Sequence, residues 1–125
     1  MNDEAKHQVL LIDDELIALT NLTTVLEREG YRVTACKTGE EGVAALQSTA
    51  FDLVLTDLRM PGIDGIDVLR HIRETMPEVP VIMITGHATL DSAVDAMKAG
   101  AYHYIAKPFR LAEVREVVRG ALELR

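Results

Sequence analysis

The chain has 125 residues, of which 48% are hydrophobic and 26% are charged. This balance excludes a disordered chain and a fibrous repeat, and the length fits a single domain with its own core. The formal net charge is −7 and the sequence holds no basic stretch, which argues against direct binding of nucleic acid.

The cysteine content, the N-terminal residues and the hydropathy indicate the cellular compartment. The only cysteine, Cys36, cannot form a disulfide within the chain, and no spacing of Cys and His is typical of a zinc site. Residues 1–6 are polar, which excludes a secretory signal peptide. No apolar run reaches the ~18 residues of a membrane span. We therefore expect one cytoplasmic domain over residues 1–125 that contacts no membrane.

Five apolar segments are expected as strands. Residues 9–12, 53–55 and 79–84 are almost continuously hydrophobic, which is typical of parallel strands that helices cover on both faces. Residues 31–36 alternate between polar and apolar side chains, and residues 104–106 form only a short run. The last two segments are therefore expected at the edges of the sheet.

Helical periodicity fills the intervals between these strands. The expected apolar stripes consist of Leu16, Leu19, Thr23 and Leu26; Val43 and Leu46; Ile66, Leu69 and Ile72; Leu90, Ala93, Val94 and Met97; and Val114, Val117, Val118, Ala121 and Leu122. Gly30 and Gly100 supply stops after the first and fourth helices, and Pro77 follows the third. The pattern predicts an α/β fold with a five-stranded parallel sheet and five helices on both faces. The common flavodoxin-like strand order at this length is 2-1-3-4-5.

Polar residues follow four of the five expected strands. Asp13 and Asp14 follow the first strand, Asp57 the third, Thr85 the fourth and Lys107 the fifth. In an open α/β sheet, ligands bind beyond the carboxyl ends of the strands, where the strand order reverses. These polar strand ends therefore predict a single site.

The three carboxylates of this set indicate a cation. If the first and third strands are neighbours, Asp13, Asp14 and Asp57 crowd together and raise one another's pKa unless a cation compensates. Hard oxygen ligands with open water positions favour Mg²⁺ over Zn²⁺. The plainer interpretation is that Asp13 caps the next helix and Asp57 begins a turn, since Asp favours both places. That interpretation explains neither Lys107 nor Thr85.

Lys107 and Thr85 each have two interpretations. Lys107 is either a surface lysine or an ammonium that holds an anion beside the carboxylates. A cis Lys107–Pro108 bond would aim it inward, but the sequence leaves the isomer open. Thr85 is either an ordinary strand residue or a hydroxyl that a ligand approaches across Gly86, which has no side chain. Four histidines lie in separate segments, and most are expected on solvated faces: His7, His71, His87 and His103.

Four motifs, taken in order, resemble the receiver domain of bacterial two-component response regulators. They are LIDDE at residues 11–15, TDLRMPGIDG at 56–65, ITG at 84–86 and YIAKPF at 104–109. The resemblance covers essentially the whole chain. The stretch from residue 86 to residue 101 is also similar to receivers attached to σ54-dependent AAA+ transcription activators, which favours a longer protein with a C-terminal output domain.

The resemblance implies a phosphoryl-transfer site. Asp57 would be the phosphoacceptor and would take a phosphoryl group from the phosphohistidine of a sensor kinase. Asp14 and Asp57 would bind Mg²⁺ directly, together with the backbone carbonyl of Arg59, and Asp13 would act through water. Lys107 would contact the phosphoryl oxygens. Such a domain is regulatory rather than an enzyme, although it promotes its own phosphorylation and dephosphorylation.

The resemblance also implies a switch. Thr85 would hydrogen-bond to the phosphoryl group, and Tyr104, at the aromatic switch position, would rotate into the space that Thr85 leaves. The surface of the fourth helix, fifth strand and fifth helix would change. The candidate residues of this surface, which fit the hydrophobic core equally well, are Met97, Ala101, Tyr102 and Val114. A hydrogen bond to a charged group contributes roughly 1.5–3 kcal/mol, whereas a shift of the population from 1:99 to 99:1 needs about 5.5 kcal/mol, so one or two new bonds should shift the balance only partly. We therefore expect a partner, or a second copy in a phosphorylation-dependent homodimer, to complete the change.

Some positions leave the kinetics open. Arg59 and His87 match places that tune dephosphorylation in the family, so the lifetime of the acyl phosphate is not predicted. His103 stands where related sequences often carry an acidic residue, and its effect is not predicted either.

Three other functions fit this sequence less well. A phosphohydrolase of the haloacid dehalogenase type needs a second carboxylate where this chain has Arg59. A flavin binder needs a different loop after the first strand, because Asp13, Asp14 and Glu15 would repel the flavin phosphate. A degenerate receiver that serves only for docking is disfavoured because every site position is filled.

Overall fold

Five parallel strands alternate with five helices in the computed structural model, which describes residues 6–123. The strands are β1 (Gln8–Ile12), β2 (Arg32–Cys36), β3 (Leu53–Thr56), β4 (Val81–Thr85) and β5 (His103–Ala106). The helices are α1 (Leu16–Arg28), α2 (Gly39–Ser48), α3 (Gly65–Thr75), α4 (Leu90–Lys98) and α5 (Leu111–Glu123).

The strand order is β2-β1-β3-β4-β5, and every neighbouring pair is parallel, as the sequence predicted. All residues of β3 and β4 are buried, whereas the edge strands β2 and β5 expose part of their side chains. The difference explains the two kinds of strand pattern, because a central parallel strand has helices on both faces and an edge strand is only partly covered.

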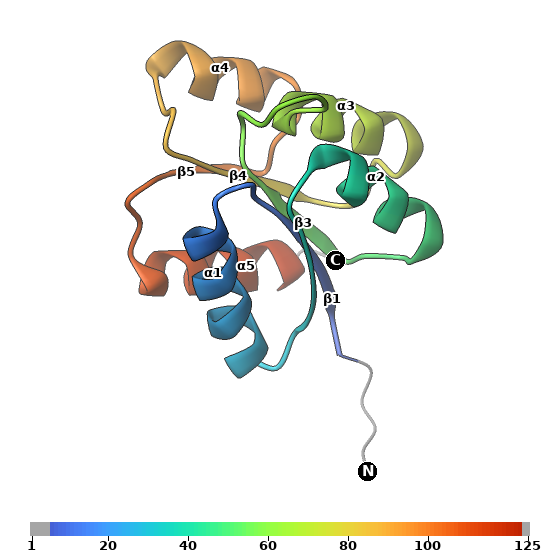
Figure 1. The fold of residues 1–125 in the computed structure, drawn as a ribbon, viewed down its shortest axis with the longest axis vertical. Helices are drawn as coiled ribbons and strands as arrows, with labels where there is room; N and C mark the ends of the chain where they lie inside the picture. The colour runs from blue at the N-terminus through green and yellow to red at the C-terminus, as the bar shows by residue number, and fades with distance from the viewer. Residues whose placement is uncertain (1–5, 124–125) are drawn as a thin grey trace.

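The helices form two layers on opposite faces of the sheet (Figure 1). α2, α3 and α4 cover one face, where Leu10, Val54 and Met83 of the sheet pack with Val68 of α3. α1 and α5 cover the other face, and the core there includes buried residues of both helices, such as Leu26 and Val118. Within the described residues, no helix has both the length and the hydropathy of a membrane span.

The predicted buried stripe of α4 is wrong. Leu90, Val94 and Met97 are 79%, 40% and 47% exposed, and the buried positions of α4 are Ser92 and Ala96. Helical spacing identifies residues that share a face, but it does not identify which face meets the sheet. The small side chains of Ser92 and Ala96 let α4 lie close to β5, so the large apolar residues point to solvent.

The expected stripe of α1 needs a correction at Leu16, which is 66% exposed, because α1 buries Ala18, Leu19 and Leu22 instead. For Ala101 and Val114, the sequence left the changing surface and the core as alternatives. Both belong to the core, at 7% and 0% exposed.

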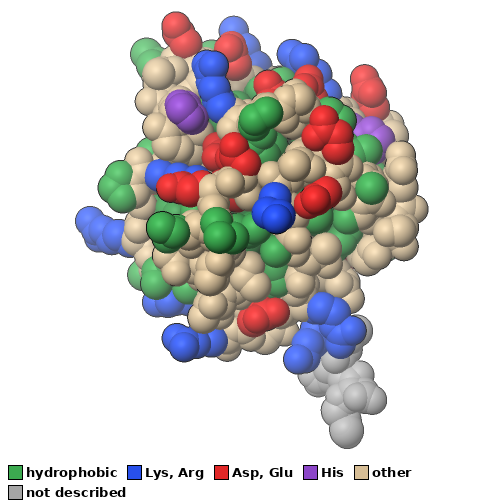
Figure 2. Space-filling view, viewed as in Figure 1, with side chains coloured by type: hydrophobic (Ala, Val, Ile, Leu, Met, Phe, Trp, Pro, Cys, Tyr) green, Lys and Arg blue, Asp and Glu red, His purple; other side chains and the backbone are tan. Residues whose placement is uncertain are grey.

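Side chains of opposite charge are interspersed on the surface. On the face shown in Figure 2, Lys and Arg side chains alternate with Asp and Glu, and hydrophobic side chains reach the surface between them. Three of the histidines are exposed, namely His7, His87 and His103, and His71 is half-buried.

Candidate functional site

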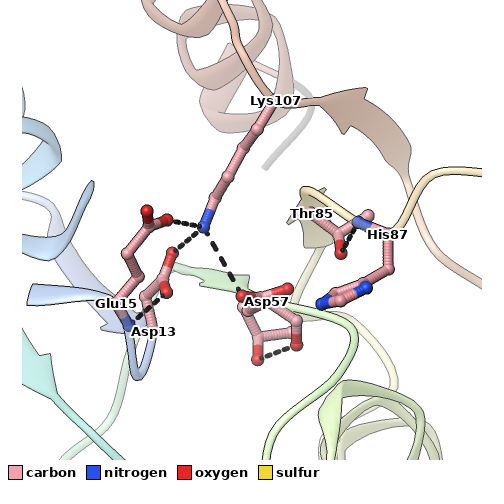
Figure 3. A network of polar contacts seen from close by, with 7 residues as sticks. Asp13, Glu15, Asp57, Thr85, His87 and Lys107 are labelled. Atoms are coloured by element: carbon pink, nitrogen blue, oxygen red, sulfur yellow. Dashed lines mark hydrogen bonds and ion pairs between the residues drawn. The ribbon is translucent and has the colours of Figure 1, made fainter. Parts of the chain in front are cut away.

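Asp13 and Asp57 lie side by side because they follow neighbouring strands. β1 and β3 pair in register, with Ile12 opposite Thr56. The backbone N–H of Asp57 donates to Ile12 O over 2.9 Å, which places both aspartates at the carboxyl edge of the sheet (Figure 3). Both residues are buried: Asp13 is 1% and Asp57 5% exposed.

Asp14 completes a group of three carboxylates. Asp13, Asp14 and Asp57 each offer an oxygen within 4.8 Å of the oxygens of the other two, and Asp14 is exposed. Asp57 Oδ1 is buried and has no hydrogen-bond partner within residues 6–123. An unpaired buried carboxylate oxygen beside an accessible carboxylate is a donor set that suits a hard divalent cation such as Mg²⁺.

Lys107 reaches this group from the end of β5. Its Nζ lies 2.8 Å from Asp13 Oδ2, 2.9 Å from Glu15 Oε1 and 3.5 Å from Asp57 Oδ2 (Figure 3). The backbone N–H of Lys107 donates to Thr85 O over 2.8 Å, which fixes the start of the side chain. The Lys107–Pro108 peptide bond, whose isomer the sequence left open, is cis.

The charges of the site shift two pKa values. Burial raises the pKa of Asp13, and the negative charge of Asp57 raises it further, although hydrogen bonds from Lys107 and from the Glu15 backbone oppose the rise. Burial by itself lowers the pKa of Lys107. Its hydrogen bonds to Asp13 and Glu15 and the charges of Asp13 and Asp57 outweigh this effect and raise the pKa above that of an ordinary lysine. Lys107 is therefore charged at neutral pH, as a group that holds an anion must be.

Glu15 is part of the site, although the sequence analysis gave it no role there. It follows Asp14 directly, so the run of three acidic residues was the available signal. Asp13 does not act as the cap of α1: the N-cap residue is Glu15, whose side chain makes no capping bond. Instead, Asp13 Oδ1 accepts from the backbone N–H of Glu15 over 2.9 Å.

Thr85 lies at the end of β4, on the same edge of the sheet. It is 0% exposed, and its Oγ1 accepts a hydrogen bond from the His87 backbone N–H over 3.0 Å (Figure 3). The next residue, Gly86, is exposed, and a Cβ on it would meet no atom nearer than Lys107 Cδ at 4.0 Å.

The loop after β3 is held close to Asp57. A Cβ on Gly65 would lie 2.2 Å from the carbonyl oxygen of Asp57, so only glycine fits there. The backbone N–H of Gly65 donates to Leu58 O over 2.9 Å. Arg59, in this loop, is exposed.

Tyr104 lies outside the carboxylate group. It is half-buried on β5, and its hydroxyl is 2.7 Å from Ser92 Oγ of α4. Ser92 is a small polar residue outside every apolar stripe and motif, so no sequence pattern indicates a role for it.

The family model of the response regulator receiver domain matches residues 9–119. The chain is 38% identical over 122 residues to the alginate biosynthesis transcriptional regulatory protein AlgB of Pseudomonas aeruginosa, a match over 98% of this chain and 27% of AlgB. It is 39% identical over 114 residues to the DNA-binding transcriptional regulator NtrC of Salmonella typhimurium, a match over 91% of this chain and 24% of NtrC. The chain thus spans about a quarter of the length of these relatives.

Solved structures share the fold. A receiver domain protein (CheY-like) from Methanospirillum hungatei superposes with a TM-score of 0.91 at 32% identity, over 96% of each chain. NtrX from Brucella abortus, in complex with ADP, superposes with a TM-score of 0.90 at 33% identity, over 96% of this chain and 28% of NtrX.

Proposed function

Since the chain belongs to the response regulator receiver domain family, we propose that it is a phosphorylation-activated signalling switch with Asp57 as its phosphoacceptor. One observation carries the proposal. The Lys107 ammonium is 3.5 Å from Asp57 Oδ2, while the other oxygen, Oδ1, is buried and unpaired. Asp57 therefore has a positive charge beside one carboxylate oxygen, while its other oxygen has no hydrogen-bond partner within residues 6–123.

The reaction we propose is the transfer of a phosphoryl group from a phosphohistidine of a sensor kinase. A carboxylate oxygen of Asp57 attacks phosphorus and forms the O–P bond of an acyl phosphate. The P–N bond to the kinase histidine breaks, and its electron pair stays on the imidazole nitrogen, which takes up a proton. Lys107 lies where it can attract the phosphoryl oxygens, and alignment with charge stabilisation is what this chemistry needs.

We propose that Asp14 and Asp57 bind Mg²⁺ directly with the backbone carbonyl of Arg59, and that Asp13 contributes through water. The unpaired Asp57 Oδ1 and the exposed Asp14 support these assignments. A bound divalent ion supplies positive charge to the phosphoryl oxygens and to the crowded carboxylates. Asp13 is already engaged by Lys107 and the Glu15 N–H, which supports an indirect role.

We propose that the phosphoryl group changes the α4–β5–α5 surface through Thr85 and Tyr104. Thr85 Oγ1 accepts one hydrogen bond, and its hydroxyl proton is available to a phosphoryl oxygen. The exposed Leu90, Val94 and Met97 of α4 supply an apolar surface that a second copy or an output domain would cover. The names of AlgB and NtrC support a transcriptional output.

The kinase partner needs a surface next to Asp57. A groove between α1 and the segment after β5 begins at Glu15 and Lys107 and continues along Ile17, Phe109 and Leu111. Ile17 and Leu111 are 72% and 42% exposed. A groove with apolar side chains that begins at Glu15 and Lys107, beside Asp57, fits the docking of the kinase segment that carries the phosphohistidine. We place this encounter in the cytoplasm.

The decisive experiment uses acetyl phosphate with Mg²⁺. We expect the protein to gain the mass of one phosphoryl group, and hydroxylamine to remove it, because an acyl phosphate is labile to that nucleophile. Asp57→Asn is expected to abolish the adduct. Asp91→Asn, which changes an exposed aspartate of α4, is the matched control and is expected to leave the adduct intact.

Three results would contradict the proposal. An adduct that survives in Asp57→Asn would place the chemistry elsewhere. A wild-type protein that forms no adduct and does not bind beryllofluoride with Mg²⁺ would favour a receiver used only for docking. Steady release of phosphate from many small phosphate esters would favour the phosphohydrolase, although the exposed Arg59 stands where that enzyme needs a general acid.

A further inference from the structure

A second group of hydrogen bonds lies at the start of α4 and centres on Ser92. Ser92 is 9% exposed. Its Oγ lies 3.0 Å from Thr89 N, 3.0 Å from Thr89 Oγ1, 3.1 Å from Thr89 O and 3.4 Å from His87 O. The shortest contact, 2.7 Å, is with the hydroxyl of Tyr104 on β5.

Several groups share the limited hydrogen-bonding capacity of Ser92. A serine hydroxyl has one proton and two lone pairs. The Thr89 backbone N–H donates to Ser92 Oγ, and the Ser92 proton has carbonyl acceptors at Thr89 O and His87 O. The second lone pair lies within reach of two hydroxyls, that of Thr89 at 3.0 Å and that of Tyr104 at 2.7 Å. The contact with Tyr104 is the shorter of the two, and it is the one that joins α4 to β5.

The loop between β4 and α4 is also hydrogen-bonded to Thr85. The His87 backbone N–H donates to Thr85 Oγ1 over 3.0 Å, and the carbonyl of His87 lies 3.4 Å from Ser92 Oγ. The backbone of His87 thus connects the hydroxyl of Thr85, at the carboxyl end of β4, to the serine that contacts Tyr104.

α4 has few other contacts that would fix its position. Its buried residues are Ser92 and Ala96, while Leu90, Val94 and Met97 are exposed. An element that buries little apolar surface shifts at low cost in free energy. A single hydrogen bond between α4 and β5 therefore weighs heavily in the balance between two positions of α4.

We propose that Ser92 is a positioning residue that holds Tyr104 in its resting orientation and couples it to Thr85 through the backbone of His87. The inference rests on the proposed function and adds the regulation of that site. When Thr85 turns toward a phosphoryl group, its bond to the His87 N–H weakens and the loop is free to shift. Ser92 then releases Tyr104, which rotates inward.

A purely structural role for Ser92 makes a different prediction. Thr89 and Ser92 form a capping box at the N-terminus of α4, and this box does not include Tyr104. If Ser92 acted only in the capping box, removal of the Tyr104 hydroxyl would not alter the affinity for a phosphoryl analogue. Removal of the Thr89 hydroxyl would then change that affinity as much as removal of the Ser92 hydroxyl.

The test measures the affinity for beryllofluoride with Mg²⁺ in the whole chain. Ser92→Ala removes a bond present in the resting state, so we expect roughly five-fold tighter binding, the change that one neutral hydrogen bond produces in an equilibrium constant. In a Tyr104→Phe background, Ser92→Ala should have no further effect. Ser92→Thr keeps a hydroxyl and should restore wild-type affinity. Thr89→Ala, the control, should not tighten binding.

A second readout needs no ligand on the variant. Amide resonances of α4 in unliganded Ser92→Ala should shift toward their positions in wild-type protein with beryllofluoride. Unchanged affinity in Ser92→Ala, or an effect of the same size in both Tyr104 backgrounds, would overturn the inference. Failure of the wild type to bind beryllofluoride, or equal binding by Asp57→Asn, would instead overturn the proposed function.

Discussion

Lys107 and Asp13 are 94 residues apart in the chain, yet Lys107 Nζ and Asp13 Oδ2 lie 2.8 Å from each other. The side chain of Asp13 is 2% exposed and that of Asp57 is 6% exposed, so the lysine is the nearby cation for two buried carboxylates. The ion pair therefore links the residue after β1 to the residue after β5. It bears on the stability of the fold and on the charge around Asp57.

Removing this cation should destabilise the fold. Lys107→Met leaves Asp13 and Asp57 buried without a counter-charge. We expect the free energy of unfolding to fall by about 2 kcal/mol at neutral pH without Mg²⁺. The loss is smaller than for a fully buried ion pair because Glu15, the third partner of Lys107, is exposed to solvent. Urea unfolding followed by circular dichroism measures the loss. Adding Asp13→Asn should recover much of it, and a double variant that is as unstable as Lys107→Met would contradict this account.

Mg²⁺ should stabilise the folded chain. A ligand at 100 times its dissociation constant adds about 2.7 kcal/mol to the free energy of unfolding if it binds only the folded state. Thermal unfolding with increasing Mg²⁺ measures the effect. Asp14→Asn removes an exposed carboxylate and should abolish the stabilisation while leaving the metal-free protein folded. Equal stabilisation of the variant would exclude Asp14 from the metal site.

Cys36 should make stability depend on pH in the alkaline range. Burial raises the pKa of its thiol above the ordinary value of about 8.5. A group with a raised pKa in the folded state contributes stability below its unfolded pKa and loses it as the pH rises through the folded pKa. Above about pH 8, the wild type should therefore lose stability faster than Cys36→Ala as the pH rises.

The comparison for Cys36 uses slopes, because the alanine also leaves a small cavity that lowers stability at every pH. Burial raises the pKa of Tyr31 as well, and this residue is present in both proteins. Its contribution therefore cancels. Parallel stability profiles for the two proteins would show that the thiol does not titrate with folding.

Gly65 and Gly86 form a matched pair of glycines around the site. A methyl group at Gly65 collides with the Asp57 carbonyl oxygen, so Gly65→Ala must move the backbone. We expect a loss of about 2 kcal/mol in stability and weaker binding of beryllofluoride. Gly86→Ala meets open space and should change stability by less than about 0.5 kcal/mol. Similar effects of the two substitutions would contradict the close approach at Gly65.

The exposed face of α4 can be tested in the same way. Leu90→Ala should change the free energy of unfolding by less than about 0.5 kcal/mol, because the side chain is 79% exposed. Leu69→Ala in α3 removes a side chain that is 0% exposed and should cost about 3 kcal/mol. Urea unfolding of both variants measures the contrast, and a large loss in Leu90→Ala would place that residue in the core.

Much of the fold could be predicted from local patterns. The continuous apolar runs of β1, β3 and β4 indicated buried parallel strands, and the strand order followed from the chain length and the alternation of elements. The burial pattern of α4 could not be predicted. The helix carries two alternative faces, and only its packing against β5 places Ser92 and Ala96 inside.

Local sequence alone determined which groups stand at the carboxyl ends of the strands: the acids after β1 and β3, Thr85 on β4 and Lys107 after β5. It did so because strand patterns fix where each strand stops. Only the tertiary structure decided which of these groups touch, that Glu15 shares Lys107 with Asp13, and that Ser92 contacts Tyr104. Those contacts depend on the path of loops and the rotation of helices, which hydrophobic periodicity does not encode.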